Sequence, residues 1–280
     1  MNMKNCRNII LAAAVLVAAS SCSDKVQIKG TIAGAPDTQV VVKQLNGGAL
    51  VALDTVKTDG KGAYSYSVEV LKGQPQFIYL YKGDTKVASL LLQKGDKVKV
   101  ASDTLGKYSV EGSAESELLR QVEVDFAAFL DKFTADAARG DNAAASKDYI
   151  DYYRGRVKFI MENAKSLTAI PVLYQKINDN FPVFSQATDA IMFRNVHDSL
   201  MTVYPESRYV SALAREAEKR FNAFDLSQRI QNAQESSYPD LYLPSVDGTK
   251  VRLSEVGSKV VLVYFWQAAD AAQKMFNQDV

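Results

Sequence analysis

Three successive patterns of apolar residues divide this chain of 280 residues and constrain what it can fold into. From residue 25 to about residue 112, apolar and polar residues alternate in short runs, which is the period of half-buried β-strands. From 113 to about 235, apolar residues recur at three and four positions, which is the period of one helix face. Short strand patterns return from 238 to 280. The chain is therefore predicted to have an α+β fold.

The first pattern predicts an antiparallel β-sandwich or barrel over residues 22–112. Glycine-rich turns such as Asn46-Gly47-Gly48 and Lys94-Gly95-Asp96 separate its predicted strands. Two runs, 77–81 and 89–93, are richer in apolar residues and are predicted to be more buried than the others. We interpret the acidic residues of this region as turn residues rather than catalytic groups: Asp54, Asp59, Asp84, Asp96 and Asp103.

The second pattern predicts a helical unit of about five helices over residues 113–235. Ser113 is the predicted N-cap of the first helix, because acidic residues follow it in the first turn. A break at residues 140–142 precedes a second helix, predicted over 147–164. Pro171 suits the first turn of a third helix that ends at residues 178–182. Two further helices are predicted over about 185–203 and 207–224.

The helical unit contains two groups that could be imagined as functional. Its aromatic residues could form a ligand-binding platform, but their helical spacing favours a place in the core or at an interface: Tyr149, Tyr152, Tyr153 and Phe159. His197 is the one histidine of the chain, and its spacing pairs it with no cysteine, serine or aspartate. No nucleotide-binding or serine-hydrolase motif is present. The sequence predicts no catalytic residue, no metal site and no cofactor.

The N-terminal segment has the organisation of a secretory signal peptide over residues 1–21. Lys4 and Arg7 precede an uncharged apolar run that is too short to span a bilayer, and small residues lead into Cys22. The segment resembles the lipobox of bacterial lipoproteins, which implies acylation of Cys22 and a membrane anchor. It further implies a place in the cell envelope, as an outer-membrane lipoprotein facing the periplasm or the surface. The alternative is a plain signal peptide with an incidental cysteine.

The two cysteines of the chain, Cys6 and Cys22, both lie in or next to this signal segment. The folded part can therefore form no internal disulfide, no cysteine-based metal site and no thiol redox centre. The formal net charge of +1 gives no indication of a nucleic-acid partner.

The third pattern combines a hairpin with a long apolar run. Two short strands are predicted on either side of the Asp247-Gly248 turn. The uninterrupted apolar run at 260–266 is typical of a strand buried on both faces, as in a parallel α/β sheet. Without partner strands, the run is expected either to pack onto the helical unit or to be poorly ordered.

Residues 238–249, 251–254 and 259–266 closely resemble the start of thioredoxin-like thiol-disulfide oxidoreductases of the alkyl hydroperoxide reductase and thiol-specific antioxidant superfamily. The motif begins Tyr238-Pro239-Asp240 and ends in a valine-rich strand with Phe265-Trp266. Upstream, segments such as 62–66 and 110–113 look like the all-β domain of unknown function that precedes such domains in Gram-negative lipoproteins. Residues 204–210 are similar to a Pro-x-Ser element of their helical linker. The resemblance implies a partial thioredoxin-like domain over 236–280.

The chain departs from this family where the redox chemistry resides. Alignment on Phe265-Trp266 puts Asp270 and Gln273 at the positions of the two reactive cysteines. A carboxylate and a carboxamide cannot form or attack a disulfide. A complete thioredoxin fold also needs roughly another sixty residues, so the C-terminal segment is expected to be incomplete.

These observations predict a redox-inactive, lipid-anchored envelope protein that acts in binding or scaffolding, with an envelope protein as its possible partner. Two alternatives stay open at this point. One is a truncated or frameshifted form of an envelope thiol-disulfide oxidoreductase. The other is a surface lipoprotein that binds glycans or proteins. The sequence predicts no oligomeric state.

Overall fold

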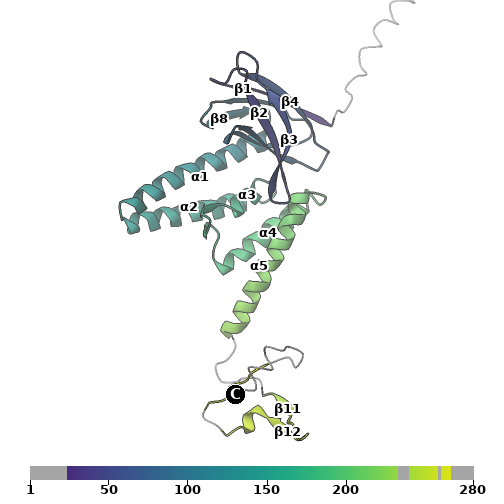
Figure 1. Ribbon diagram of the computed structural model, residues 1–280, viewed down its shortest axis with the longest axis vertical. Coiled ribbons are helices and arrows are strands. Elements are labelled where there is room, and N and C mark those ends of the chain that lie inside the picture. The colour runs from purple at the N-terminus through teal and green to yellow at the C-terminus, as the bar shows by residue number, and fades with distance from the viewer. Residues whose placement is uncertain (1–23, 233–239, 258–259, 266–280) are drawn as a thin grey trace, which may run out of the picture. The chain divides into compact units, whose positions relative to one another are not determined.

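The computed structural model describes residues 24–232, 240–257 and 260–265. The chain divides into two compact units, Met1–Leu226 and Ser227–Val280. In the first unit the eight strands between residues 25 and 111 gather at one end and the helices at the other (Figure 1). The predicted α+β class is confirmed. Among the described helices, none combines the length and the apolarity that a bilayer crossing requires.

Eight strands form two four-stranded sheets in the first unit, with the orders β4-β1-β7-β8 and β3-β2-β5-β6. Most neighbours are antiparallel, as predicted, but β1 and β7 run parallel, with Ile28 opposite Val98. The strands are β1 (Lys25–Ile32), β2 (Gln39–Asn46), β3 (Ala49–Lys57), β4 (Ala63–Glu69), β5 (Gln76–Lys82), β6 (Thr85–Leu92), β7 (Lys97–Ser102) and β8 (Tyr108–Glu111).

In the sheet β3-β2-β5-β6, strands β5 and β6 are buried on both faces by apolar side chains. Successive residues of a strand point to opposite faces, and in β5 they enter two different cores. Ile78 and Leu80 belong to the core between the sheets, whereas Phe77 and Tyr79 pack with residues of the helices. This double burial explains the apolar runs at 77–81 and 89–93 and confirms that they are the most buried strands.

Strands β3 and β8 were not predicted from the sequence. β3 lies at the edge of its sheet, and most of its side chains are exposed, so it shows no alternation of buried and exposed positions. It also contains Asp54, which therefore does not lie beside a turn as predicted. β8 has only four residues, fewer than a periodic pattern needs to be recognised.

Three further aspartates lie in turns and bond backbone groups there, as predicted: Asp59, Asp96 and Asp103. The Oδ1 atom of Asp59 accepts hydrogen bonds from the backbone N–H groups of Lys61, at 2.8 Å, and Ala63, at 2.9 Å. These bonds lower the pKa of the Asp59 carboxyl. Asp96 and Asp103 accept backbone hydrogen bonds in the same way. Turn chemistry accounts for these side chains.

The junction between sheets and helices is built at Gly112 and Ser113. Gly112 has a φ of 81°, and a Cβ atom there would lie 2.0 Å from the carbonyl oxygen of Lys97, so no other residue fits. Ser113 caps helix α1 (Ala114–Ala138) by accepting a hydrogen bond from Ser116 N at 3.3 Å, which confirms the predicted N-cap. The Ser116 hydroxyl in turn bonds the backbone of Leu91, so the helix starts in contact with β6.

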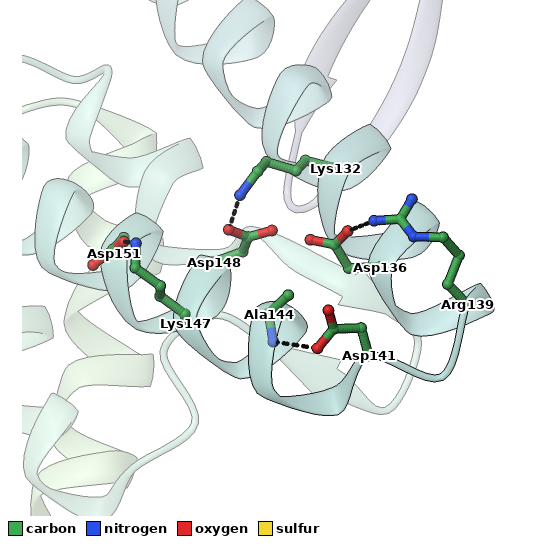
Figure 2. A network of polar contacts seen from close by, with 8 residues as sticks. All are labelled: Lys132, Asp136, Arg139, Asp141, Ala144, Lys147, Asp148 and Asp151. Atoms are coloured by element: carbon green, nitrogen blue, oxygen red, sulfur yellow. Dashed lines mark hydrogen bonds and ion pairs between the residues drawn. The ribbon is translucent and has the colours of Figure 1, made fainter.

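Helices α1 and α2 (Asn142–Glu162) form a hairpin whose tip is held by polar contacts, shown in Figure 2. Asp141 caps α2 by accepting from Ala144 N at 3.0 Å, so the helix begins five residues earlier than the predicted residue 147. Lys132 of α1 pairs with the buried carboxylate of Asp148 on α2. This ammonium group holds the pKa of Asp148 below its usual value.

The prediction of a third helix that continues to residues 178–182 is mostly wrong. Helix α3 covers only Ala169–Leu173, and the chain then forms a small hairpin of β9 (Lys176–Asn178) and β10 (Phe181–Pro182). The Asn178 side chain accepts from Asn180 N at 3.0 Å, which stabilises a turn in place of a helical continuation. The last two helices are confirmed as α4 (Ala190–Met201), preceded by the short helix η1 (Ala187–Asp189), and α5 (Arg208–Asn232).

In the second unit the predicted hairpin is confirmed as β11 (Tyr242–Pro244) and β12 (Lys250–Arg252), followed by the short helix η2 (Leu253–Glu255). The predicted buried strand is wrong for its described part. Residues 260–265 form no strand, and Val260 and Leu262 are 86% and 89% exposed. A central strand needs hydrogen-bonded neighbours on both sides, and β11 and β12 pair only with each other among the described strands.

Candidate functional site

Tyr209, in the first turn of α5, joins the helices to the outer face of the sheet β3-β2-β5-β6. Its hydroxyl donates to the carbonyl of Leu45, at 3.2 Å, and accepts from Phe77 N, at 3.1 Å. Its ring meets the Phe77 ring edge-on, with 4.9 Å between the centroids. One buried side chain thus satisfies backbone groups of two strands, β2 and β5.

The residues before Tyr209 extend the same interface. The Ser207 hydroxyl accepts from Tyr209 N at 3.3 Å, as an N-cap does. Arg208 donates to the side-chain oxygen of Gln76 at 2.5 Å, and Gln44 donates to the same oxygen at 2.7 Å. The segment 204–210, predicted to be part of a linker, is therefore the contact between helix α5 and the sheet.

Beside Tyr209 the structure contains a cavity of about 390 Å³, which we call the interface pocket. The sheet contributes Leu45 and Tyr79, and the turn between β2 and β3 contributes its two glycines. Helix α3 and the residue after it contribute Ile170 and Tyr174. A cavity of this size that is largely apolar is typical of a binding site for a small molecule.

Helix α5 forms the charged side of the interface pocket. Arg208, Ala212 and Arg215 all line it, and their spacing of four and then three residues places them on one helix face. The small side chain of Ala212 leaves space between the two arginines. Within the described part of the chain, neither guanidinium forms an ion pair with a carboxylate, and Arg215 has no recorded hydrogen bond. The charged groups that line the pocket are therefore two guanidinium groups on exposed residues, and neither is paired with a carboxylate in the described structure.

The tyrosines of the interface pocket stay neutral at physiological pH. Burial raises the pKa of Tyr79 and Tyr209, and burial together with the nearby Glu216 carboxylate raises that of Tyr174. Because none of these phenols ionises near neutral pH, they cannot neutralise the arginines. The charged side chains of the lining itself are Arg208 and Arg215.

The aromatic residues considered as a platform are part of the packing between helices, as predicted. Tyr152 stacks on Phe129 with 4.1 Å between the centroids, and its hydroxyl donates to Gln175 at 2.9 Å. The hydroxyl of Tyr149 donates to the carbonyl of Val183, and that of Tyr153 donates to Asp189. Phe159 packs against the same core.

His197 lies in a second cavity of about 460 Å³ between α4 and α5. Its Nδ1 atom is 2.9 Å from Asp198, its neighbour in the chain, and Glu218 also lines the cavity. No group of three or more potential metal-binding side chains occurs in the described ranges. Cys22, the predicted lipidation residue, and the positions Asp270 and Gln273 lie outside the described residues.

The sequence did not predict the interface pocket, because its walls come from segments that are far apart in the chain. A partial indication exists in retrospect. Arg208 and Arg215 are seven residues apart on a helix with Ala212 between them, which is a basic stripe on one face. What covers the stripe could be known only from the packing of α5.

Comparison with known proteins assigns part of the first unit. Residues 26–119 match the domain of unknown function DUF4369. The match starts in β1 and ends at Leu119, a buried residue early in α1. This limit fits the contacts of Ser113 and Ser116 with β6, which make the start of α1 a physical part of the β region. No curated protein matches the chain.

Proposed function

We propose that this protein is a lipid-anchored binding module of the bacterial cell envelope, which binds a small ligand in the interface pocket and performs no thiol chemistry. It would be a relative of the thioredoxin-like envelope oxidoreductases. The observation that carries the proposal is the largely apolar cavity beside Tyr209, with two arginines that no carboxylate compensates in the described structure. Asp270 and Gln273 at the family's cysteine positions support a role in binding over redox catalysis.

Acylation of Cys22 is the part of the proposal that rests on sequence alone. Cells fed a clickable palmitate analogue are expected to label the protein, and Cys22→Ala is expected to abolish the label. Cys6→Ala is the matched control, because Cys6 is the one other cysteine and lies inside the predicted signal peptide. Equal labelling of the wild type and Cys22→Ala would contradict the lipid anchor.

A larger side chain inside the interface pocket is expected to weaken the binding of a small apolar molecule without unfolding the protein. Nile red, a neutral dye that fluoresces in apolar surroundings, serves as the probe for the pocket. Ala212→Leu is expected to reduce dye affinity at least about tenfold, because a leucine side chain would occupy the space between the two arginines. Leucine keeps the helix propensity of the position high, so the far-ultraviolet circular dichroism is expected to stay unchanged.

The matched control is the same substitution on another face of α5. Ala214 lines the second cavity, beside His197, and does not line the interface pocket. Ala214→Leu is therefore expected to bind Nile red as the wild type does. If Ala214→Leu lowered the affinity for Nile red and Ala212→Leu did not, the dye would bind the second cavity and not the interface pocket. If Nile red did not bind the wild type, the proposed function would be refuted.

A further inference from the structure

We infer that the ligand of the interface pocket is an organic carboxylate with an apolar body, whose carboxylate is bound by Arg208 and Arg215. The inference rests on the proposed function, since it requires that this pocket binds a ligand. It names the chemical class of that ligand.

The charge of the pocket lining points to an anion. Its two ionised groups at neutral pH are the guanidinium groups of Arg208 and Arg215, and its lining includes no aspartate or glutamate. The tyrosines around them are neutral. A positive potential next to an apolar wall attracts negative charge more strongly than it would in open water, because the wall excludes solvent.

The geometry of α5 suits a planar anion. Seven residues of helix separate Arg208 from Arg215, which is about 10 Å along the axis. Both long side chains can therefore turn toward an anion placed over Ala212. The recorded side-chain bond of Arg208 goes to Gln76, and a guanidinium has five N–H donors, so others remain for a ligand. A fork of parallel N–H groups matches the two oxygens of a carboxylate.

The remaining walls suit an apolar body. Leu45, Ile170 and Leu213 supply aliphatic surface, and the ring of Tyr174, which is 42% exposed, also lines the pocket. Each buried methylene is expected to raise affinity about fourfold until the cavity is filled. A flexible chain with one terminal carboxylate therefore fits both the charge and the size of the pocket.

The test uses isothermal titration of the mature chain with octanoate, decanoate and dodecanoate, and with decanol as a neutral partner of decanoate. A leucine-ending tripeptide and its C-terminal amide form a second arm, which separates a fatty acid from a peptide carboxylate as the source. We expect decanoate to bind at least about tenfold more tightly than decanol, and the difference to shrink as salt is added.

Arg215→Gln is expected to weaken decanoate binding about five- to tenfold, and Arg215→Lys to weaken it less, since lysine keeps the charge and loses the fork. Arg215 is the better arginine to replace because, within the described residues, it forms no hydrogen bond that the substitution would also remove, whereas Arg208 bonds Gln76. Lys219→Gln removes a charge from an exposed position of α5 outside the pocket and is expected to bind decanoate as the wild type does.

The outcomes separate this inference from the proposed function. Binding of either acid, with loss in Arg215→Gln, supports the inference and identifies its source. Equal affinity for decanoate and decanol, together with equal affinity for the tripeptide acid and its amide, overturns it. If Nile red binds and neither acid displaces it, the ligand class is wrong and the binding function stands. If Nile red does not bind, both the proposed ligand class and the proposed binding function are wrong.

Discussion

Raising the pH above 10 is expected to unfold the first unit in one narrow transition, which is the largest effect that we anticipate. Burial raises the pKa of Tyr64, Tyr79 and Tyr108 well above the ordinary value of 10.0, and raises that of Tyr152 to about 12. For Tyr108, the nearby Glu123 carboxylate adds to the effect of burial. All four phenols are thus protonated in the folded chain at a pH where they ionise in the unfolded chain.

The sign of this effect follows from proton linkage. Between pH 10 and the raised pKa values, the unfolded chain has released phenolic protons that the folded chain retains. The unfolded state then binds fewer protons, so the free energy of unfolding falls as the pH rises. Each tyrosine contributes about 1.4 kcal/mol per pH unit, and four contribute about 5–6 kcal/mol per pH unit. One pH unit in this range therefore removes a free energy comparable with the whole stability of an ordinary domain, about 5–15 kcal/mol.

The measurement is far-ultraviolet circular dichroism against pH, recorded with the phenolate absorbance. Both signals are expected to change together in the folded-to-unfolded step. A single phenolate titration with its midpoint near pH 10, with the circular dichroism unchanged, would show that these side chains are not protected.

Tyr64 offers the matched variant for this experiment. Its hydroxyl is buried and has no hydrogen-bond partner in the described structure, and its ring covers Gly30 on the neighbouring strand. Tyr64→Phe keeps the ring and removes the titrating group. It is therefore expected to move the alkaline midpoint upward and to leave the stability at pH 7 equal or slightly higher.

Replacing Tyr209 by alanine is expected to lower the free energy of unfolding by about 3–5 kcal/mol, the usual cost of removing a large buried aromatic side chain. The substitution removes the ring that packs on Phe77 and the hydroxyl that bonds Leu45 and Phe77. Because these contacts join α5 to two strands, the substitution weakens the packing between the helices and the sheet. Urea denaturation followed by circular dichroism measures the change.

Tyr209→Phe separates the contribution of the hydroxyl from that of the ring. It keeps the ring and leaves the N–H group of Phe77 without its recorded side-chain acceptor, at an expected cost of about 1–3 kcal/mol. Tyr242→Ala serves as the control, because Tyr242 is 51% exposed on β11, and should change stability by less than about 0.5 kcal/mol. If Tyr209→Ala cost under 1 kcal/mol, the interface would not depend on this residue.

The sequence predicted the elements whose signals are local. Alternation and glycine turns located β1, β2, β4 and β7, because one face of each strand is buried and the turns need special backbone geometry. Apolar runs located β5 and β6, which are buried on both faces. Ser113 was predicted as an N-cap from its own neighbours and is one. Two of the failures had causes that the local sequence does not show. β3 is an exposed edge strand without a period, and the apolar run at 260–265 has no strand to pair with in the described structure.

The candidate site shows the same division. The sequence by itself determined that α5 carries Arg208, Ala212 and Arg215 on one face, because helical period decides which residues share a face. It did not determine what covers that face. Only the tertiary structure brought the face beside Leu45, Tyr79 and Tyr174 and left its arginines without a recorded carboxylate partner. The physical reason is that periodicity is a property of neighbouring residues, whereas a pocket and its charge balance arise from packing between segments distant in the chain.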